Sequence, residues 1–483
     1  MIANRIGRDR ASTHAVVIGG SMAGMLAARI LADHFDQVTV IERDRFPDAA
    51  NSRNGVPQSR HLHVLLERGR LILERLFPGL TAELIADGAS LVDTAADFAI
   101  LNPAGWAVQF PSGIGMMACS RDLLDWHVRR HVRALPPVQF LPETDVAGLV
   151  PTSDRSDNCG VIVRRHGEQS ADRAGDETLH ADLVVDASGR GSRSPKWLEA
   201  LGYPAVNETV VNAFVGYASR VVRRPAALPA GHRGIFLQAA PPKHNRAGVA
   251  FPIEGDRWIV TLSGGGRDYP PADEAGFLRF LRSLRSPILY NALKDAEPLT
   301  PIAVHRGGEN RIRHFEQMPA WPERFVVMGD AVCSFNPVYG QGMTIAALSA
   351  EALSGCLTEQ RHRRAAGDLT GLARRFQCEV GQLNALPWML STSEDLRYAA
   401  VEGTRPRWTT RLLHRYVDCV LRLNTTSPIV RKRSLQVFHM LKSPAALFHP
   451  GTIARALWQL AKSPARPNAV EPAIAAAPVS QLA

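Results

Sequence analysis

Residues 325–342 read FVVMGDAVCSFNPVYGQG. The apolar, partly β-branched run at the start is typical of a buried strand that stops at the carboxylate of Asp330. A turn rich in Pro and Gly follows, and the apolar stretch Met343–Leu357 predicts a helix behind it. Gly340 and Gly342 frame the amino end of that helix, where free N–H groups and the positive end of the dipole suit an anionic ring or oxygen. The stretch therefore predicts an anion site beside an acceptor for ligand hydroxyls.

A second corner of this kind lies near the start of the chain. A predicted strand, residues 15–18, leads through the turn GGSMAG (residues 19–24) into a predicted helix. The turn is G-x-S-x-x-G, with Ser21 where the dinucleotide fingerprint G-x-G-x-x-G has its second glycine. The next predicted strand, residues 37–41, ends at Glu42, where an acid is expected to meet an adenosine ribose. This order predicts a nucleotide site, and the alternative is a buried βαβ unit with a glycine turn.

A third corner follows the predicted strand 183–185. It reads DASGRGSR (residues 186–193), again an acid followed by glycines and arginines, and the basic pair favours contact with a phosphate. A flavin joins a sugar alcohol to a ring that becomes negatively charged, which is the kind of ligand that residues 325–342 suit.

Two further arginines stand where they could meet a phosphate. Arg53 lies beside Gly55 in a polar loop. Arg121 lies in the first turn of a helix that we expect Ser120 to cap, and a cation there is unfavourable to the helix dipole. A bound anion would explain Arg121, and the alternative is an ordinary exposed arginine.

The composition limits the function classes. The chain has 483 residues, of which 45% are hydrophobic and 21% charged, as in soluble proteins with two or three units. Lys and Arg outnumber Asp and Glu by 56 − 46, a net charge of +10, but no basic block alternates with aromatic residues. We therefore expect no nucleic-acid partner, and the charge suits an anionic cofactor, a phosphate-bearing co-substrate or a membrane surface.

Cysteine and histidine patterns predict neither a disulfide frame nor a metal site. The six cysteines include no Cys-x-x-Cys pair, which favours reduced thiols and a cytoplasmic location. His61 and His63 lack further ligands at a recognisable spacing, so we interpret them as ordinary residues of a loop-to-helix junction. The first residues run directly into a strand and no run of about 18 apolar residues occurs, so we expect neither a signal peptide nor a membrane span.

Residues 205–321 carry mainly strand signals, with a hairpin turn at 254–256, and predict a sheet inserted between nucleotide-binding pieces. We expect its aromatic residues to pack in the core rather than face a ligand: Phe214, Tyr217, Phe236, Phe251 and Trp258. Beyond Leu357 the chain is helical and rich in arginine. A helical cap with solvated charges is the expected structure, and contact with a membrane surface is the alternative.

Taken together, these motifs resemble the FAD-dependent monooxygenases of the para-hydroxybenzoate hydroxylase fold, and among them bacterial olefin epoxidases of polyether and polyketide biosynthesis. The resemblance covers residues 14–360. It implies an α/β fold: a Rossmann-like FAD-binding domain of the GR2 type, an inserted β-sheet substrate domain and a C-terminal helical region. The implied FAD-binding segments are 1–94, 119–204 and 322–375, and the implied substrate domain is 95–118 with 205–321. A helical cap would span 376–463 and a disordered tail 464–483.

The resemblance also implies which residues hold FAD. Around the ADP half and the pyrophosphate it places Gly19, Ser21, Ala23, Gly24, Glu42, Arg43, Arg53, Val56, Arg121, Val146, Asp186 and Gly189. Around the ribityl chain and the flavin edge it places Gly329, Asp330, Pro337, Gly340, Gly342 and Met343. Pro337, Gly340 and Gly342 would form the catalytic flavin-edge loop, with no side-chain base. Asp186, Gly189 and Arg193 match the family's second acid-glycine motif, but glycine follows the acid by three places instead of one. The resemblance implies NAD(P)H as electron donor, and whether it binds this chain directly or acts through a flavin reductase stays open.

The implied reaction passes one oxygen atom from a flavin C4a-hydroperoxide to an apolar natural product. An alkene needs no protein base for this step, whereas a phenol does. No His or acid in the inserted sheet demands that role, so epoxidation is favoured. The alternatives are an aromatic hydroxylase, a flavin-dependent reductase of isoprenoid double bonds, and a flavoprotein scaffold on membranes. A halogenase is disfavoured because its Trp-x-Trp-x-Ile-Pro signature is absent.

Overall fold

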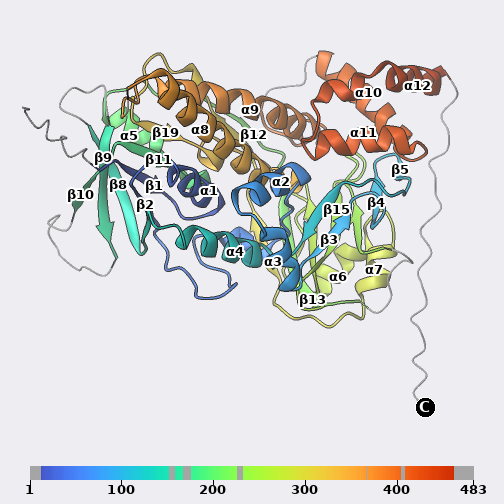
Figure 1. Cartoon of the computed structure of the whole chain (residues 1–483). Coiled ribbons are helices and arrows are strands. Elements are labelled where there is room, and N and C mark those ends of the chain that lie inside the picture. Colours follow the sequence, from blue (N-terminus) through green and yellow to red (C-terminus); the bar gives the residue numbers. More distant parts are fainter. Residues whose placement is uncertain are drawn as a thin grey trace, which may run out of the picture.

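Five parallel strands form the central sheet, in the order β19-β11-β1-β2-β7 (Figure 1). They are β1 (His14–Ile18), β2 (Gln37–Ile41), β7 (Val138–Leu141), β11 (Leu183–Asp186) and β19 (Phe325–Val327). The apolar runs of β1, β11 and β19 are buried, as expected for parallel strands that are covered on both faces. In this computed structural model the described residues are 12–151, 158–166, 176–225, 232–365, 367–403 and 408–461.

Helices and a small sheet cover the central sheet. Helix α1 (Met22–Leu31) packs against α8 (Gly342–Arg363), which in turn packs against the long α9 (Leu372–Asp395). An antiparallel sheet of β8 (Thr144–Pro151), β9 (Asn158–Arg165) and β10 (Glu177–His180) lies at the left of Figure 1. These elements share one large hydrophobic core with α4 (Arg121–Arg133) and α5 (Ser194–Ala200).

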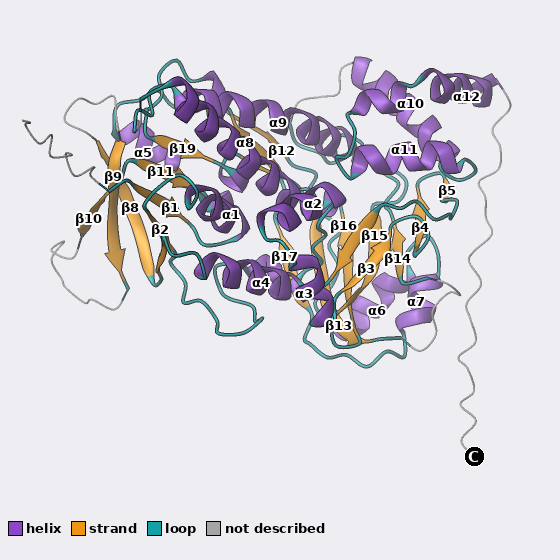
Figure 2. Cartoon of the chain, in the orientation of Figure 1, coloured by secondary structure: helices purple, strands orange, loops and turns teal. Residues whose placement is uncertain are grey.

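A seven-stranded sheet forms the second half of the molecule, in the order β17-β13-β16-β15-β14-β4-β5. Its strands are β4 (Phe98–Asn102), β5 (Gly105–Trp106), β13 (Gly216–Arg223), β14 (Gly234–Leu237), β15 (Arg246–Ile253), β16 (Arg257–Gly264) and β17 (Ala303–Arg306). Helices α6 (Glu274–Arg282) and α7 (Ile288–Leu293) cover one face with a separate apolar core. Figure 2 shows this strand layer beside the helix-covered central sheet.

Smaller elements connect the two halves. They are α2 (Glu67–Leu76), α3 (Leu80–Ala86), β3 (Ser90–Asp93), β6 (Gly115–Ala118), β12 (Glu208–Val211), β18 (Asn310–Arg313) and β20 (Cys333–Ser334). The last three form a sheet of their own, which adjoins the residues after β19. The chain continues through α10 (Trp408–Leu423), α11 (Pro428–Phe438) and α12 (Pro450–Ala461), at the upper right of Figure 1.

The predicted α/β fold with an inserted sheet and C-terminal helices is confirmed. Tyr217, Phe251 and Trp258 are buried in hydrophobic clusters, as predicted. Within the predicted sheet region, residues 210–222 form parts of two strands, β12 and β13, and Phe214 lies between them with a left-handed φ of 49°. The predicted tail lies outside the described residues. In the part of the chain that the structure describes, no helix is long and apolar enough to cross a membrane.

Candidate functional site

Three glycine turns meet at the carboxyl ends of β1, β11 and β19. Gly19 has a φ of 100°, and a Cβ atom there would lie 2.7 Å from the carbonyl oxygen of Ala187. Gly329 has a φ of 64°, and its Cβ would lie 2.8 Å from the Cβ of Ala23. Larger residues would force these turns apart. The sequence-predicted corners therefore converge on one place, at the end of a parallel sheet where nucleotides bind in such folds.

The β1–α1 turn is closed from inside by Gly24. A Cβ atom at this position would lie 1.7 Å from the carbonyl oxygen of Gly19. No side chain caps the amino end of α1. The turn therefore presents the positive end of the helix dipole, as binding of a pyrophosphate requires.

Glu42 ends β2 beside this turn and is buried. Its Oε2 atom accepts a hydrogen bond of 2.9 Å from the backbone N–H of Gly20 and pairs with the guanidinium of Arg53 at 2.8 Å. Arg53 also donates to the carbonyl oxygen of Gly20 at 2.8 Å. A carboxylate offers about four acceptor sites, so Glu42 retains capacity for a ligand hydroxyl.

Arg121 enters the site from α4 and is buried, so the reading of an exposed arginine is wrong. Ser120 caps this helix as predicted, since its hydroxyl accepts a hydrogen bond from the N–H of Leu123. The guanidinium of Arg121 binds Asp125 at 2.7 Å and donates to the hydroxyl of Ser21 at 3.3 Å. Asp125, one turn further along α4, thus offsets the unfavourable placement of a cation in the first turn.

Asp330 follows β19, at the carboxyl end of the central sheet. Its side chain is open to solvent on one side, although protein surrounds it on the others. This burial raises the pKa of Asp330 above its ordinary value, while the charges of Arg190 and Arg121 oppose the increase. Its Oδ1 atom lies 3.6 Å from where a Cβ of Gly342 would stand, at the uncapped amino end of α8. The carboxylate and the helix terminus therefore face the same space.

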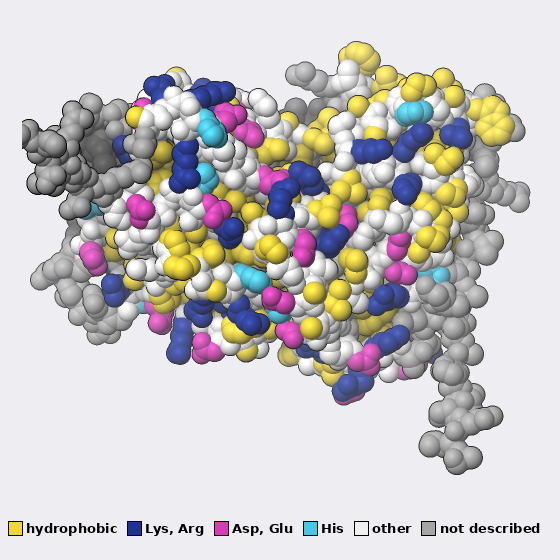
Figure 3. Space-filling model, in the orientation of Figure 1, with side chains coloured by type: hydrophobic (Ala, Val, Ile, Leu, Met, Phe, Trp, Pro, Cys, Tyr) yellow, Lys and Arg dark blue, Asp and Glu magenta, His cyan; other side chains and the backbone are white. Residues whose placement is uncertain are grey.

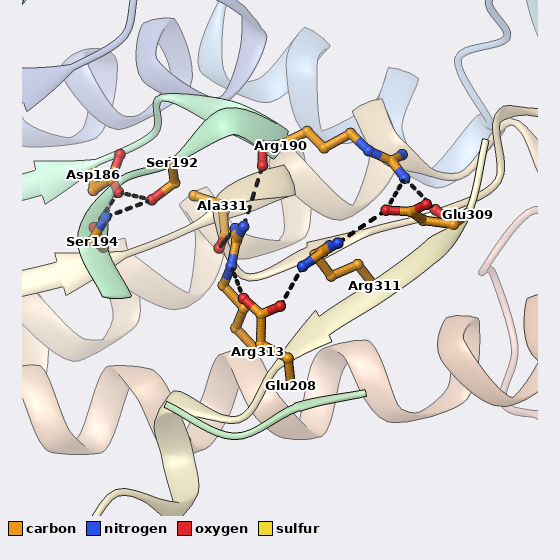
Figure 4. A network of polar contacts seen from close by, with 9 residues as sticks. All are labelled: Asp186, Arg190, Ser192, Ser194, Glu208, Glu309, Arg311, Arg313 and Ala331. Carbon is orange, nitrogen blue, oxygen red and sulfur yellow. Dashed lines mark hydrogen bonds and ion pairs between the residues drawn. The ribbon is translucent and has the colours of Figure 1, made fainter. Parts of the chain in front are cut away.

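Asp186 holds the third corner, residues 186–193, through hydrogen bonds within the chain (Figure 4). It is fully buried, and its carboxylate accepts a 2.8 Å bond from the N–H of Ser188 and bonds from the hydroxyls of Ser192 and Ser194. The turn that it stabilises, residues 189–191, carries Gly189 and Arg190. Gly189 and Arg190 are partly exposed, so they are the residues of this corner that could face a ligand.

Arg313, on β18, joins the third corner (residues 186–193) to the turn after β19, as Figure 4 shows. Its guanidinium donates to the carbonyl oxygen of Ala331 at 2.8 Å and to that of Arg190 at 3.3 Å, and it pairs with Glu208 at 2.8 Å. Arg311 extends the network to Glu208 and to Glu309. Arg313 is buried, so these bonds form a rigid clamp between the turns.

A buried polar network fixes residues 336–342, which we call the edge loop. Asp395, near the end of α9, accepts hydrogen bonds from Tyr339 at 2.7 Å, from Asn310 at 2.7 Å and from Asn336 at 3.2 Å. Asn310 in turn accepts from the N–H of Asn336 at 2.8 Å and from Ser391 at 2.6 Å. Burial raises the pKa of Asp395 to about 6, although these hydrogen bonds favour its charged form.

A cluster of His61, Tyr217, Ser219 and His305, the histidine cluster, adjoins the edge loop. His61 Nδ1 lies 2.8 Å from the hydroxyl of Ser219, and its ring lies 6.1 Å from that of His305. Tyr217 binds both Asn336 and the N–H of Val338. Burial and the neighbouring charges of His305 and Arg60 lower the pKa of His61 to about 4. Burial, with the charge of Arg121, lowers that of His63 to about 3.

The remaining sequence-predicted residues lie around this centre. Val56 is buried next to Arg53, and Met343 is buried in the first turn of α8. Pro337 is exposed on the edge loop, and Gly340 of the same loop lies close to Val64. Arg43 is exposed, and Val146 is buried on β8. Among the residues that the structure describes, no group of three or more His, Cys, Asp or Glu could hold a metal ion.

Sequence reasoning missed Arg313, Asp395 and the histidine cluster. The two residues His61 and His63 were visible, but the partners of His61 are Ser219 and His305, more than 150 residues away. No local sequence pattern predicts contacts between residues so far apart in the chain. Arg313 could have been noticed as one of two arginines that alternate on a short strand, Asn310–Arg313.

The donors and acceptors at the three corners fit FAD. The uncapped amino end of α1 and the buried guanidinium of Arg121 suit a pyrophosphate, and the uncapped amino end of α8 suits an anionic ring edge. Glu42 and Asp330 suit the hydroxyls of ribose and ribitol.

Comparison with known proteins also indicates a flavin-binding protein. A family model described as an FAD binding domain matches residues 12–370. Protein Rv3254 of Mycobacterium tuberculosis is 34% identical over 452 residues, which cover 91% of both chains. A kynurenine 3-monooxygenase of Salinispora arenicola is 26% identical over 77% of this chain and 78% of its own. The flavin-dependent halogenase CmlS, at 17% identity, shares the fold with a TM-score of 0.61 over 93% of this chain and 77% of its own.

The chain therefore belongs to the FAD binding domain family. Within it, the chain is an FAD-dependent monooxygenase.

Proposed function

We propose that this monooxygenase transfers one oxygen atom to an apolar alkene and so forms an epoxide. The observation that carries the proposal is the weak acid–base character of the histidine cluster. Near neutral pH His61 is unprotonated and a poor base, because its pKa is lowered to about 4. Burial raises the pKa of Tyr217 well above its ordinary value, so its hydroxyl keeps its proton. An alkene requires no proton transfer to these groups, whereas deprotonation of a phenol needs a base whose pKa lies nearer the working pH.

The proposed FAD site uses the three corners. The β1–α1 turn (Gly19, Ser21, Ala23 and Gly24), Arg53 and Arg121 would hold the pyrophosphate, and Glu42 the adenosine ribose. Val56, Val146 and Arg43 would lie around the adenosine, and Asp186 would support Gly189 at the third corner. Asp330 would accept hydrogen bonds from ribityl hydroxyls, with Gly329, Pro337, Gly340, Gly342 and Met343 at the ring edge.

When bound in its reduced form, FAD would supply an electrophilic oxygen atom derived from O2. The second oxygen atom would leave as water, and the two electrons would come from NAD(P)H, directly or through a reductase. The amino end of α8 stabilises negative charge at the ring edge. The Asp395 network holds the edge loop in place. The apolar side chains of Leu62, Val64, Ile100 and Val221 pack, partly buried, against one hydrophobic cluster of the seven-stranded sheet and would exclude water there.

The test compares two substrates with one carbon skeleton, an alkene and the corresponding phenol. The purified yellow protein is reduced without oxygen, and labelled O2 is admitted in single turnover with each compound. We expect one labelled oxygen atom in the epoxide and no labelled product from the phenol. The same protein stripped of FAD is the control and should leave both compounds unchanged.

Aromatic hydroxylation is the second candidate, because His61 belongs to the cluster that adjoins the edge loop and would be the proton acceptor there. Labelled phenol product that disappears in a His61→Gln variant, with flavin content unchanged, would establish hydroxylation instead. Saturation of the alkene without oxygen uptake would establish the reductase. Neither outcome is compatible with an epoxidase.

A further inference from the structure

The C-terminal helices expose an unusual share of the apolar surface. We call residues 408–461, with α10, α11 and α12, the C-terminal lobe. Thirteen large hydrophobic side chains are exposed among the described residues, and seven of them lie in this lobe: Trp408, Leu412, Ile429, Phe438, Phe448, Leu457 and Trp458. Figure 3 shows hydrophobic side chains along the upper right edge of the molecule, over α10 and α12, with Lys and Arg side chains below them. Apolar patches of this kind mark interaction sites.

Helix α12 buries small residues and exposes two of its large apolar residues. Its small residues Thr452 and Ala456 face inward and are buried. Its large residues Leu457 and Trp458 are 61% and 63% exposed, on the opposite side of the helix. A helix that folds only against its own protein places the large apolar residues inside.

The apolar stripe of α10 is only half covered. Tyr416, Val420 and Leu423 pack within the lobe, at helical spacing along one face. Leu412 and Trp408 continue this face by four residues each towards the amino end, yet Trp408 is 75% exposed. The stripe therefore extends beyond the lobe's own core.

The charge of the lobe points to an anionic occupant. The lobe contains eight Lys and Arg residues and one acid, Asp418, which pairs with Arg397 at 3.0 Å. Arg411 and Arg415 lie three residues after Trp408 and Leu412, so they flank the exposed stripe. A second copy of the chain on this face would bring like charges together. Residues 462–483 hold one acid, Glu471, and cannot neutralise the lobe.

We propose that the C-terminal lobe docks on an anionic lipid surface. Tryptophan side chains prefer the membrane–water interface, and basic residues beside them bind acidic headgroups. The lobe is held against the substrate sheet, since Asn102 donates to the carbonyl oxygen of Leu421 at 3.2 Å and Val108 to that of Asn424 at 2.9 Å. Docking therefore brings the seven-stranded sheet close to the bilayer, where apolar compounds dissolve.

The test is co-sedimentation of the full-length FAD-loaded protein with vesicles. One set contains phosphatidylcholine alone, and the other replaces a third of it with phosphatidylglycerol. We expect binding to the anionic vesicles, weakened by salt, with a blue shift of tryptophan emission. Two charge reversals, Arg411→Glu with Arg415→Glu, should lower the partition coefficient by about tenfold or more. Trp408→Ser with Trp458→Ser should abolish the spectral shift.

Matched controls lie elsewhere on the surface. Leu71→Ser with Ile85→Ser removes exposed apolar side chains outside the lobe, and Lys196→Glu with Lys243→Glu reverses exposed charges there. Both should bind vesicles like the parent, and flavin absorbance and circular dichroism report folding of every variant. Equal binding to both vesicle types, or binding that the lobe variants leave intact, overturns the proposal. A dimer that the tryptophan variant dissociates, without vesicle binding, assigns the face to a second copy and also overturns it.

Discussion

Replacement of Asp395 by asparagine tests the buried network behind the edge loop. In the folded protein burial raises the pKa of this aspartate to about 6, from an ordinary value of 3.8. The folded state therefore binds the proton more tightly than the unfolded state does. This contribution to stability is complete below about pH 3.8 and is lost as the pH rises through about 6.

The two pKa values differ by about 2, which corresponds to about 3 kcal/mol of stability at 1.36 kcal/mol per pKa unit. About 2 kcal/mol of this change falls between pH 4.5 and pH 7.5. The asparagine side chain cannot ionise, so the variant lacks this dependence. The free energy of unfolding of the parent minus that of Asp395→Asn should therefore fall by about 2 kcal/mol over this range.

The assay is urea unfolding of both proteins at the two pH values, followed by circular dichroism, with the same FAD loading. Asp256→Asn is the matched control, because Asp256 lies exposed on a hairpin turn whose left-handed φ of 53° also suits asparagine. Its difference from the parent should not change with pH. A pH-independent difference for Asp395→Asn, or one that grows towards pH 7.5, would refute a buried aspartate that ionises with difficulty.

Two further pairs of variants test the turns. Arg313→Gln removes the buried clamp and should cost about 3–5 kcal/mol of stability, with loss of bound FAD. Arg311 is partly exposed, so Arg311→Gln should cost about 1 kcal/mol or less. Urea unfolding and flavin titration distinguish the two variants. Gly24→Ala should give a colourless protein, because its Cβ atom would lie 1.7 Å from the carbonyl oxygen of Gly19. Gly355 lies in open space on α8, so Gly355→Ala should bind FAD and gain about 1 kcal/mol of stability. A yellow Gly24→Ala protein, or equal costs at Arg313 and Arg311, would contradict the geometry.

The sequence predicted the fold well because its signals are local. Each parallel strand is a short, mainly apolar run. A glycine turn follows β1, β11 and β19 within a few residues, and an acid stands at or just after the end of β2, β11 and β19. Gly19 and Gly329 occupy positions where the neighbouring atoms leave no room for a Cβ atom. The close packing of the turns therefore requires the glycines that make the sequence pattern. Arg121 shows the limit of such local prediction. The cap of its helix was predicted, but the burial of its side chain depends on contacts with Ser21 and Asp125.

The parts that the sequence could not predict depend on contacts between distant residues. Asp395 is 85 residues from Asn310 and 59 from Asn336, and a polar residue near the end of a helix is usually solvated. It lies beyond residue 370, where the match to the FAD binding domain ends. Yet it binds the loop that we propose at the flavin edge. Helix α9 contacts both this loop and the C-terminal lobe, through Asp395 with Tyr339 and through Ser393 with His414. A substitution in α9 should therefore change flavin reactivity without any contact to FAD.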